Sequence, residues 1–129
     1  MVMKDFIQAF PKHIEAAIKI ADSIKFNLDI IDVDNIVISG QGGSAIGGVI
    51  VKNLLSERIS IPIFINQDYK IPSFVNNRTL FIASSYSGNT EETICALNIA
   101  CNRKSVIFCI CSGGEILKIA KQKSFHHIL

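Results

Sequence analysis

Short apolar runs alternate with segments of helical period along most of the chain. The runs are rich in β-branched and aromatic residues, which favour buried strands. The pattern predicts strands near 36–39, 62–66, 79–84 and 105–111, a short last strand starting at His126, and helices near 44–56, 89–102 and 113–122. Such alternation is typical of a parallel sheet with helices on both faces and right-handed crossovers. The sequence therefore predicts an α/β fold, a three-layer sandwich around a five-stranded parallel sheet.

The N-terminal segment has a helical period of its own. Its apolar residues fall on one face: Ile14, Ala17, Ile18 and Ala21. Pro11 suits the first turn of a helix, and we expect the packing of this face to end near Phe26 and Leu28. The chain is thus divided into a helical segment, residues 1–34, that packs on the domain, and one globular unit, residues 35–129.

Composition bounds the class of protein. The chain has 129 residues, 49% of them hydrophobic, and a formal net charge of +2. This length suits a single domain with one core. The lysines are scattered rather than clustered, so the sequence shows no basic patch that would bind nucleic acid or an anionic membrane. No apolar run approaches the roughly 20 residues that span a bilayer. The start lacks a secretory apolar region, so we expect a cytoplasmic protein.

The four cysteines and three histidines form no metal pattern. No pair of cysteines has C-x-x-C spacing, so reduced, buried cysteines that pack as small apolar residues are expected. The adjacent histidines His126 and His127 face opposite ways in a strand and cannot share one metal ion. We therefore predict neither a metal site nor a cofactor.

Hydroxyl groups and a glycine gather where the strand near 79–84 gives way to a helix. Ser85, Ser87 and Thr90 lie in Ser84-Ser85-Tyr86-Ser87-Gly88-Asn89-Thr90. The first amides of a helix lack intrahelical partners and carry the positive end of the helix dipole. Hydroxyl donors at the same place predict an anion pocket, most simply for phosphate.

A capped helix is the alternative interpretation of this loop. Ser87 or Asn89 would be the cap, and Glu92 would complete a capping box. Capping explains one hydroxyl and one acid but not several hydroxyls around a glycine. Glu91 and Glu92 suit the first helical turn, where acids complement the dipole, better than the role of a catalytic base. Tyr86 either packs over a sugar ring or is structural.

A glycine-rich turn follows the strand near 36–39. Gly42 and Gly43 allow positive φ and close approach of the backbone to a ligand. Ser44 lies where the helix begins, where it can cap that helix or donate to a ligand. Ligands of parallel α/β sheets collect beyond the carboxyl ends of the strands, so two such loops on neighbouring strands would frame one site.

Dinucleotide binding is a second interpretation of the same turn. Gly40 to Ala45 formally satisfies G-x-G-x-x-A between a strand and a helix, and Asp68 is a late candidate for the ribose acid. The motif alone is weak, and this hypothesis leaves the loop from Ser85 to Thr90 unexplained.

The two loops resemble those of the sugar isomerase (SIS) domain family. The resemblance rests on the motifs 42–48 and 85–93, with Ser112-Gly113-Gly114 as a weaker third match. It is closest to the N-terminal domain of bifunctional phosphoglucose/phosphomannose isomerases, and it implies a flavodoxin-like SIS fold. The residues implied to bind the phosphate or sugar are Gly42, Gly43, Ser44, Ser85, Ser87 and Thr90.

The resemblance also implies a function. The family interconverts glucose 6-phosphate or mannose 6-phosphate with fructose 6-phosphate, and its catalytic base and ring-opening histidine lie beyond the position of Leu129. No catalytic residue is therefore assigned here, and activity of this chain alone is left open. The alternative is a phosphosugar-sensing regulatory module. The resemblance implies that the chain binds these phosphosugars. It also implies association with another protein surface, either in a homodimer or with a second SIS domain.

Overall fold

The computed structural model describes residues 2–24 and 32–129. Helices and strands alternate along this part of the chain. Their order is α1 (Met3–Ser23), β1 (Asn35–Ser39), α2 (Gly42–Leu55), β2 (Ile63–Asn66), β3 (Thr79–Ser84), α3 (Glu91–Asn102), β4 (Val106–Ile110), α4 (Gly114–Gln122) and β5 (His126–Ile128). The predicted elements are all present, and their bounds differ from the prediction by at most two residues from β1 onward.

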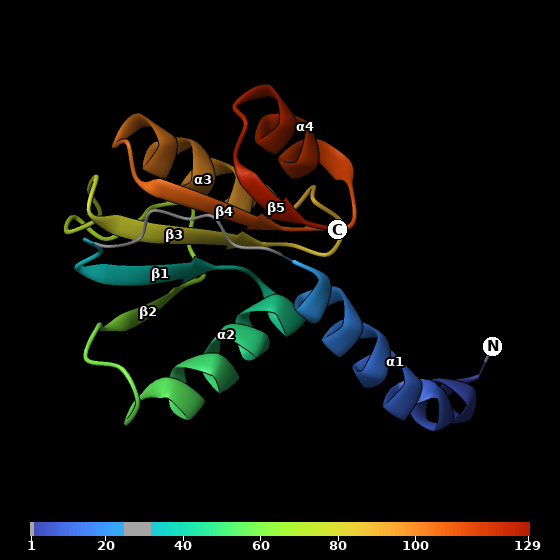
Figure 1. Cartoon of the computed structure of the whole chain (residues 1–129). Coiled ribbons are helices and arrows are strands. Elements are labelled where there is room, and N and C mark those ends of the chain that lie inside the picture. The colour runs from blue at the N-terminus through green and yellow to red at the C-terminus, as the bar shows by residue number, and fades with distance from the viewer. Residues whose placement is uncertain (1, 25–31) are drawn as a thin grey trace.

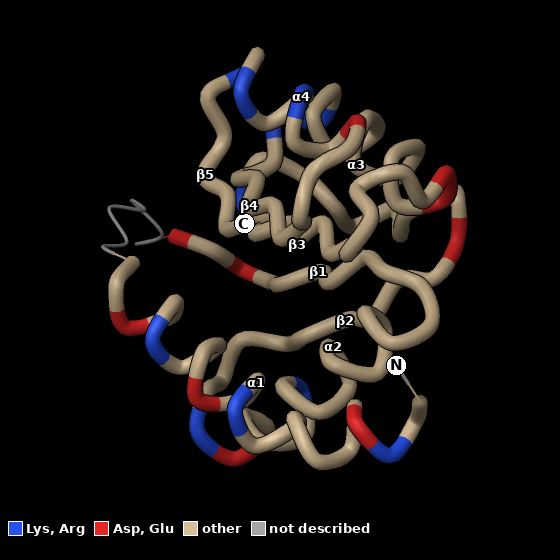
Figure 2. The backbone as a smooth tube through the Cα atoms, turned by 90° about the vertical axis from the view of Figure 1, so that its right-hand side faces the viewer, with Lys and Arg blue, Asp and Glu red and all other residues tan. Residues whose placement is uncertain are grey.

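The five strands form one parallel sheet in the order β2-β1-β3-β4-β5. In Figure 1, α3 and α4 cover one face, and α2 lies against the other. Figure 2 shows the same three layers from a second side, with the sheet between the two groups of helices. The predicted three-layer fold is confirmed. The chain order reverses between β1 and β3, which are neighbours in the sheet, so a crevice opens beyond the carboxyl ends of these two strands.

The core lies between the sheet and the α3–α4 layer. Every second residue of β3 faces it, and Phe81 is fully buried. Leu97 of α3 and Ile116 of α4 are also fully buried in this cluster. Side chains of this size each contribute about 1.5–3 kcal/mol through burial. On the other face, Gly48 lets α2 approach Ile38 closely, since the Cγ2 of Ile38 would lie 3.0 Å from a Cβ at Gly48.

Helix α1 differs from its prediction at its N-terminal end. It begins at Met3, so Pro11 lies in its interior rather than in its first turn. Apolar residues before Pro11, including Phe6 and Phe10, extend the helical period toward the N-terminus. The Val2 amide donates to Asp5 Oδ2 at 3.1 Å at the start of the helix. The expected end of packing at Phe26 and Leu28 lies outside the described residues.

No residue of α1 is buried. Ile14 and Ile18, expected to face the domain, are 45% and 55% exposed. In Figure 1 the helix extends away from the sheet, beyond the carboxyl ends of the strands. Its C-terminal half borders an apolar hollow of about 480 Å³ together with residues of β4 and β5. The division into a packed segment and a globular unit stays a prediction.

The cysteines are free, as expected, but their burial differs. Cys109 and Cys111 are buried, and burial raises the pKa of the Cys109 thiol to about 12. Cys95 was expected to be buried and is exposed, because it lies on the outer side of α3. No group of three or more acids, histidines or cysteines that could hold a metal occurs among residues 2–24 and 32–129. None of the helices described is long and apolar enough to cross a bilayer.

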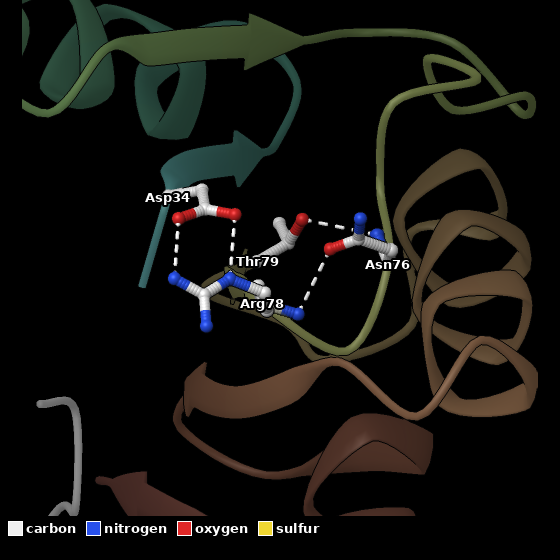
Figure 3. A network of polar contacts seen from close by, with 4 residues as sticks. All are labelled: Asp34, Asn76, Arg78 and Thr79. Atoms are coloured by element: carbon white, nitrogen blue, oxygen red, sulfur yellow. Dashed lines mark hydrogen bonds and ion pairs between the residues drawn. The ribbon is translucent and has the colours of Figure 1, made fainter. Parts of the chain in front are cut away.

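A polar network joins the amino ends of β1 and β3 (Figure 3). Arg78 donates from Nε to Asp34 Oδ2 at 2.6 Å and from Nη2 to Oδ1 at 2.7 Å. The Asp34 amide donates to the Arg78 carbonyl at 2.8 Å. Asn76 Oδ1 accepts from the Arg78 amide, and Thr79 Oγ1 accepts from the Asn76 amide. The network thus holds β1 and β3 together at their amino ends, at the opposite end of the strands from the crevice.

The Asp34–Arg78 pair predicts a small acid-dependent loss of stability. The hydrogen bond from Arg78 holds the pKa of Asp34 below its ordinary value of 3.8. A carboxyl whose pKa is lowered on folding stabilises the fold above its unfolded pKa, and the effect is lost as pH falls through the lowered value. We expect Asp34→Asn to lower Tm slightly at pH 7 and to match the unmodified chain near pH 2. Thermal unfolding followed by circular dichroism measures both. A Tm difference that persists unchanged in acid would contradict this account.

Candidate functional site

An open hollow of about 500 Å³ lies beyond the carboxyl ends of β1 and β3. The residues that line it come from the loops after these strands and from the starts of α2 and α3: Gln41, Gly43, Ser44, Ser85, Tyr86, Ser87 and Thr90. Five of the six predicted site residues are therefore brought together. The sixth, Gly42, is the first residue of α2 and is not among the lining residues. Its φ of +52° is the positive value expected for this turn.

In the loop after β3, the Ser85 hydroxyl lies within hydrogen-bond reach of the hydroxyls of Ser87 and Thr90. Ser85 is buried, and its Oγ lies 2.8 Å from Thr90 Oγ1 and 3.5 Å from Ser87 Oγ. The Gly88 amide donates to Ser85 Oγ at 3.1 Å. The Asn89 amide donates to Ser87 Oγ at 3.1 Å. Backbone amides of the loop therefore fix the hydroxyl oxygens of Ser85 and Ser87, and Ser85 in turn holds that of Thr90.

The N-terminus of α3 carries no side-chain cap. Thr90 is its N-cap residue and makes no capping hydrogen bond, because its hydroxyl is engaged with Ser85. The predicted alternative, a cap from Ser87 or Asn89, is wrong. Asn89 Oδ1 instead accepts a hydrogen bond from the Glu115 amide of α4 at 3.0 Å. The first amides of α3, with the positive end of the helix dipole, are thus left without a side-chain acceptor next to the hollow.

Ser44 enters the hollow from the opposite side. The N-cap of α2 is Gln41, so Ser44 lies in the first turn of the helix. The expectation that Ser44 caps α2 is therefore wrong, and its contact with a ligand stays a prediction. Its amide donates to the Gln41 carbonyl at 3.0 Å. Gly40 lets the two loops approach, since a Cβ there would lie 2.9 Å from the Ser84 carbonyl oxygen. The glycine turn therefore places Ser44 next to the hydroxyl-rich loop.

Gln41 is a lining residue that sequence reasoning missed. Its side-chain amide donates to the carbonyl of Gln67 in the loop after β2. The buried side chain of Asn66 donates to Ser39 Oγ and to the Asp68 carbonyl, which ties the same loops together. Position alone could have indicated Gln41, since it lies inside the glycine turn. Its partner, Gln67 in the loop after β2, could not be known before the strand order.

Among residues 2–24 and 32–129, the lining of the hollow carries no lysine, arginine, carboxylate or histidine. Tyr86 is the one titratable residue among the described lining residues and is 85% exposed. Glu91 lies outside the lining and accepts a hydrogen bond from the Tyr69 hydroxyl at 3.3 Å. The charges of Glu92 and Glu91, with partial burial, raise the pKa of Tyr69. A ligand in the hollow thus meets neutral donors, with acids at one side.

The hydroxyl-lined crevice lies at the reversal point of a parallel sheet with the strand order 2-1-3-4-5, which is the flavodoxin-like order. No protein-family model matches the chain. The chain is 39% identical, over 123 residues and 95% of its length, to the bifunctional phosphoglucose/phosphomannose isomerase of Caldicellulosiruptor bescii. Its homologues are bifunctional phosphoglucose/phosphomannose isomerases, and its structural neighbours are phosphosugar isomerases with the SIS fold. The chain covers 36% of that relative, about a third of its length.

Two solved structures share the fold. A candidate phosphosugar isomerase of Clostridium difficile 630 superposes with a TM-score of 0.78 at 25% identity, over 92% of this chain and 36% of that one. The NanR protein of Vibrio vulnificus, solved with ManNAc-6P, superposes with a TM-score of 0.57 at 23% identity. The match covers 70% of this chain and 36% of NanR. This second likeness shows the fold alone.

Proposed function

We propose that the hollow binds the phosphate group of a phosphosugar. The observation that carries the proposal is the cluster of Ser85, Ser87 and Thr90 hydroxyls beside the uncapped start of α3, with Ser44 facing it. The hydroxyls and the α3 amides would donate to the phosphate oxygens. Gly42 and Gly43 would keep the turn after β1 unhindered at the ligand.

The relatives indicate the class of sugar. We infer that fructose 6-phosphate, glucose 6-phosphate and mannose 6-phosphate are the ligands, because the homologues are phosphoglucose/phosphomannose isomerases. Anchoring of the phosphate would fix the sugar chain, and a carboxylate would then move a proton between C2 and C1 through an enediol. The part of the lining that the structure describes contains no such base. This chain would therefore act as the phosphate anchor, with the base contributed by another domain or chain.

An apolar surface supports the proposed association with a second SIS domain or a second copy. Large apolar side chains are exposed on two helices at one side of the sheet: Phe6, Ile7, Phe10, Ile14 and Ile18 of α1, and Ile46, Ile50 and Leu54 of α2. Exposed apolar area of this extent marks an interaction site. We place the protein in the cytoplasm, where phosphosugars of this class are metabolised.

A phosphosugar sensor is the second candidate function. The NanR structure, which has this fold and was solved with ManNAc-6P, supports it. A sensor would bind phosphosugar and transmit a conformational change without turnover. An isomerase domain would bind the same class of ligand and, with its base in place, convert it. Binding alone is common to both candidates, so turnover of the longest natural form of the protein separates them.

Replacing both Ser87 and Thr90 with alanine is expected to weaken binding of fructose 6-phosphate by about 2–4 kcal/mol, about 30- to 1,000-fold. Two hydroxyl donors to a charged phosphate would be lost, while the α3 amides would remain. Isothermal titration calorimetry measures the effect.

The matched control removes two exposed hydroxyls far from the hollow, with Ser56→Ala and Ser60→Ala. Its affinity should equal that of the unmodified chain. Equal affinity in the Ser87/Thr90 variant would place the phosphate elsewhere. Binding of NADH at the same hollow, lost in that variant, would instead favour the dinucleotide hypothesis.

A further inference from the structure

Asn89 lies inside the hydroxyl-rich loop, but its side chain is bonded to a different element. Its Oδ1 accepts a hydrogen bond from the amide of Glu115, in the first turn of α4, at 3.0 Å. The N-cap residue of α4 is Gly113, which has no side chain and makes no capping hydrogen bond. Asn89 therefore satisfies one of the free amides at the start of α4 from a loop 26 positions away in the sequence.

The backbone on either side of Asn89 is held by the same segment. The Ile116 amide of α4 donates to the Gly88 carbonyl at 2.9 Å. The Ser112 amide and hydroxyl both donate to the Tyr86 carbonyl, at 2.9 and 2.5 Å. The loop after β3 is thus bonded to the loop after β4 at three of its residues.

Two glycines bring the loops into direct contact. A Cβ on Gly88 would lie 1.8 Å from the Gly113 carbonyl oxygen. A Cβ on Gly114 would lie 2.4 Å from the Ser87 carbonyl oxygen and 2.8 Å from Asn89 Oδ1. Both glycines have positive φ. No side chain fits between the loops, so a shift of one must move the other.

We propose that Asn89 is a positioning residue for the phosphate site, which rests on the proposed function above. Its side chain faces α4, while its neighbours Ser87 and Thr90 line the hollow. Its own amide donates to Ser87 Oγ at 3.1 Å. Capping of α4 by Asn89 keeps this stretch of backbone against the β4–α4 loop, and that contact holds the Ser87 and Thr90 hydroxyls at the places where phosphate oxygens would bind.

Two substitutions at this position separate positioning from direct contact. Asn89→Ala removes both the acceptor for Glu115 and the amide donor. Asn89→Asp keeps an oxygen acceptor, suited to a helix N-terminus, but loses the NH₂ group that a ligand contact would need. Asn98→Ala is the matched control, because Asn98 is exposed on α3 away from the loop.

The test combines two measurements on the 129-residue chain. Amide hydrogen exchange by NMR reports protection of the Glu115 amide, and calorimetry with fructose 6-phosphate and with inorganic phosphate reports affinity. Asn89→Ala should speed exchange at Glu115 and weaken both ligands about 3- to 30-fold. Asn89→Asp should restore protection and, in about 1 M salt where charges are screened beyond about 3 Å, most of the affinity. Asn98→Ala should change neither.

Each other result has a definite meaning. If the unmodified chain binds and Asn89→Ala binds equally well, the positioning role is wrong. If Asn89→Asp protects Glu115 but does not recover affinity in high salt, the amide of Asn89 contacts the ligand directly, and positioning is overturned. If the unmodified chain binds neither ligand, the proposed function itself fails, and the inference fails with it.

Discussion

Gly88→Ala is expected to destabilise the domain by about 3–5 kcal/mol. Two costs add. Gly88 has a φ of +73°, which alanine adopts at a penalty of about 1–2 kcal/mol. The new Cβ would also lie 1.8 Å from the Gly113 carbonyl oxygen and 2.8 Å from its carbonyl carbon. Both obstacles are backbone atoms, so relief needs movement of the β4–α4 loop and the start of α4.

Urea denaturation followed by circular dichroism measures the change in the free energy of unfolding. A loss of this size is a large fraction of the 5–15 kcal/mol typical of a domain, and it should lower Tm by roughly 10–20 °C. Phosphosugar binding should be lost with it, because Gly88 and its neighbours hold the hydroxyls in place. Unchanged stability would mean that the two loops are not in contact in solution.

Gly47→Ala is the control for this substitution. Gly47 lies in the interior of α2, and a Cβ there would meet nothing within 4 Å. Alanine favours helix over glycine by about 0.8–1.0 kcal/mol. The control should therefore be as stable as the unmodified chain or slightly more so. Replacement of glycine by alanine is thus expected to lower the free energy of unfolding at Gly88, and to leave it unchanged or raise it slightly at Gly47.

The sheet could be predicted because its signals are local. Each inner strand is a run of four to six apolar or small residues between polar connectors, and only a parallel sheet covered on both faces buries such runs. The hydroxyl loop could be predicted for the same reason, since Ser85, Ser87 and Thr90 are close in sequence. Their meeting with Ser44 needed one further assumption, that β1 and β3 are neighbours, and the strand order bears this out.

The remaining features depend on contacts that span the fold. The role of Asn89 was hidden because its partner, Glu115, belongs to another loop, and a local helix cap was the nearest explanation. The start of α2 was predicted two residues too late, near Ser44, because the helix begins at Gly42, a residue with low helix propensity and a positive φ. The helical period of α1 could not predict its exposure. An apolar face indicates that a helix packs against another surface, but it does not identify that surface.

The 129-residue chain is expected to bind fructose 6-phosphate without converting it to glucose 6-phosphate. The isomerisation needs a base at C1 and C2, and the described residues that line the hollow include no carboxylate or imidazole. The nearest acids belong to the first turn of α3, where Glu91 is bonded to the Tyr69 hydroxyl. A sugar anchored by its phosphate next to this turn would extend its reactive carbons away from it. Absence of a general base typically costs about 10²–10⁴-fold in rate.

A coupled assay for glucose 6-phosphate, run at high protein concentration, should therefore stay at background. Calorimetry on the same preparation must show binding, because an unfolded sample would also be inactive. Glu91→Gln and Glu92→Gln provide the decisive controls, since each removes a carboxylate with little change in volume. Turnover that follows the purified chain and vanishes in Glu92→Gln would show that α3 itself carries the base. In that case the chain would be an isomerase in its own right, and its uncapped helix start would serve chemistry as well as binding.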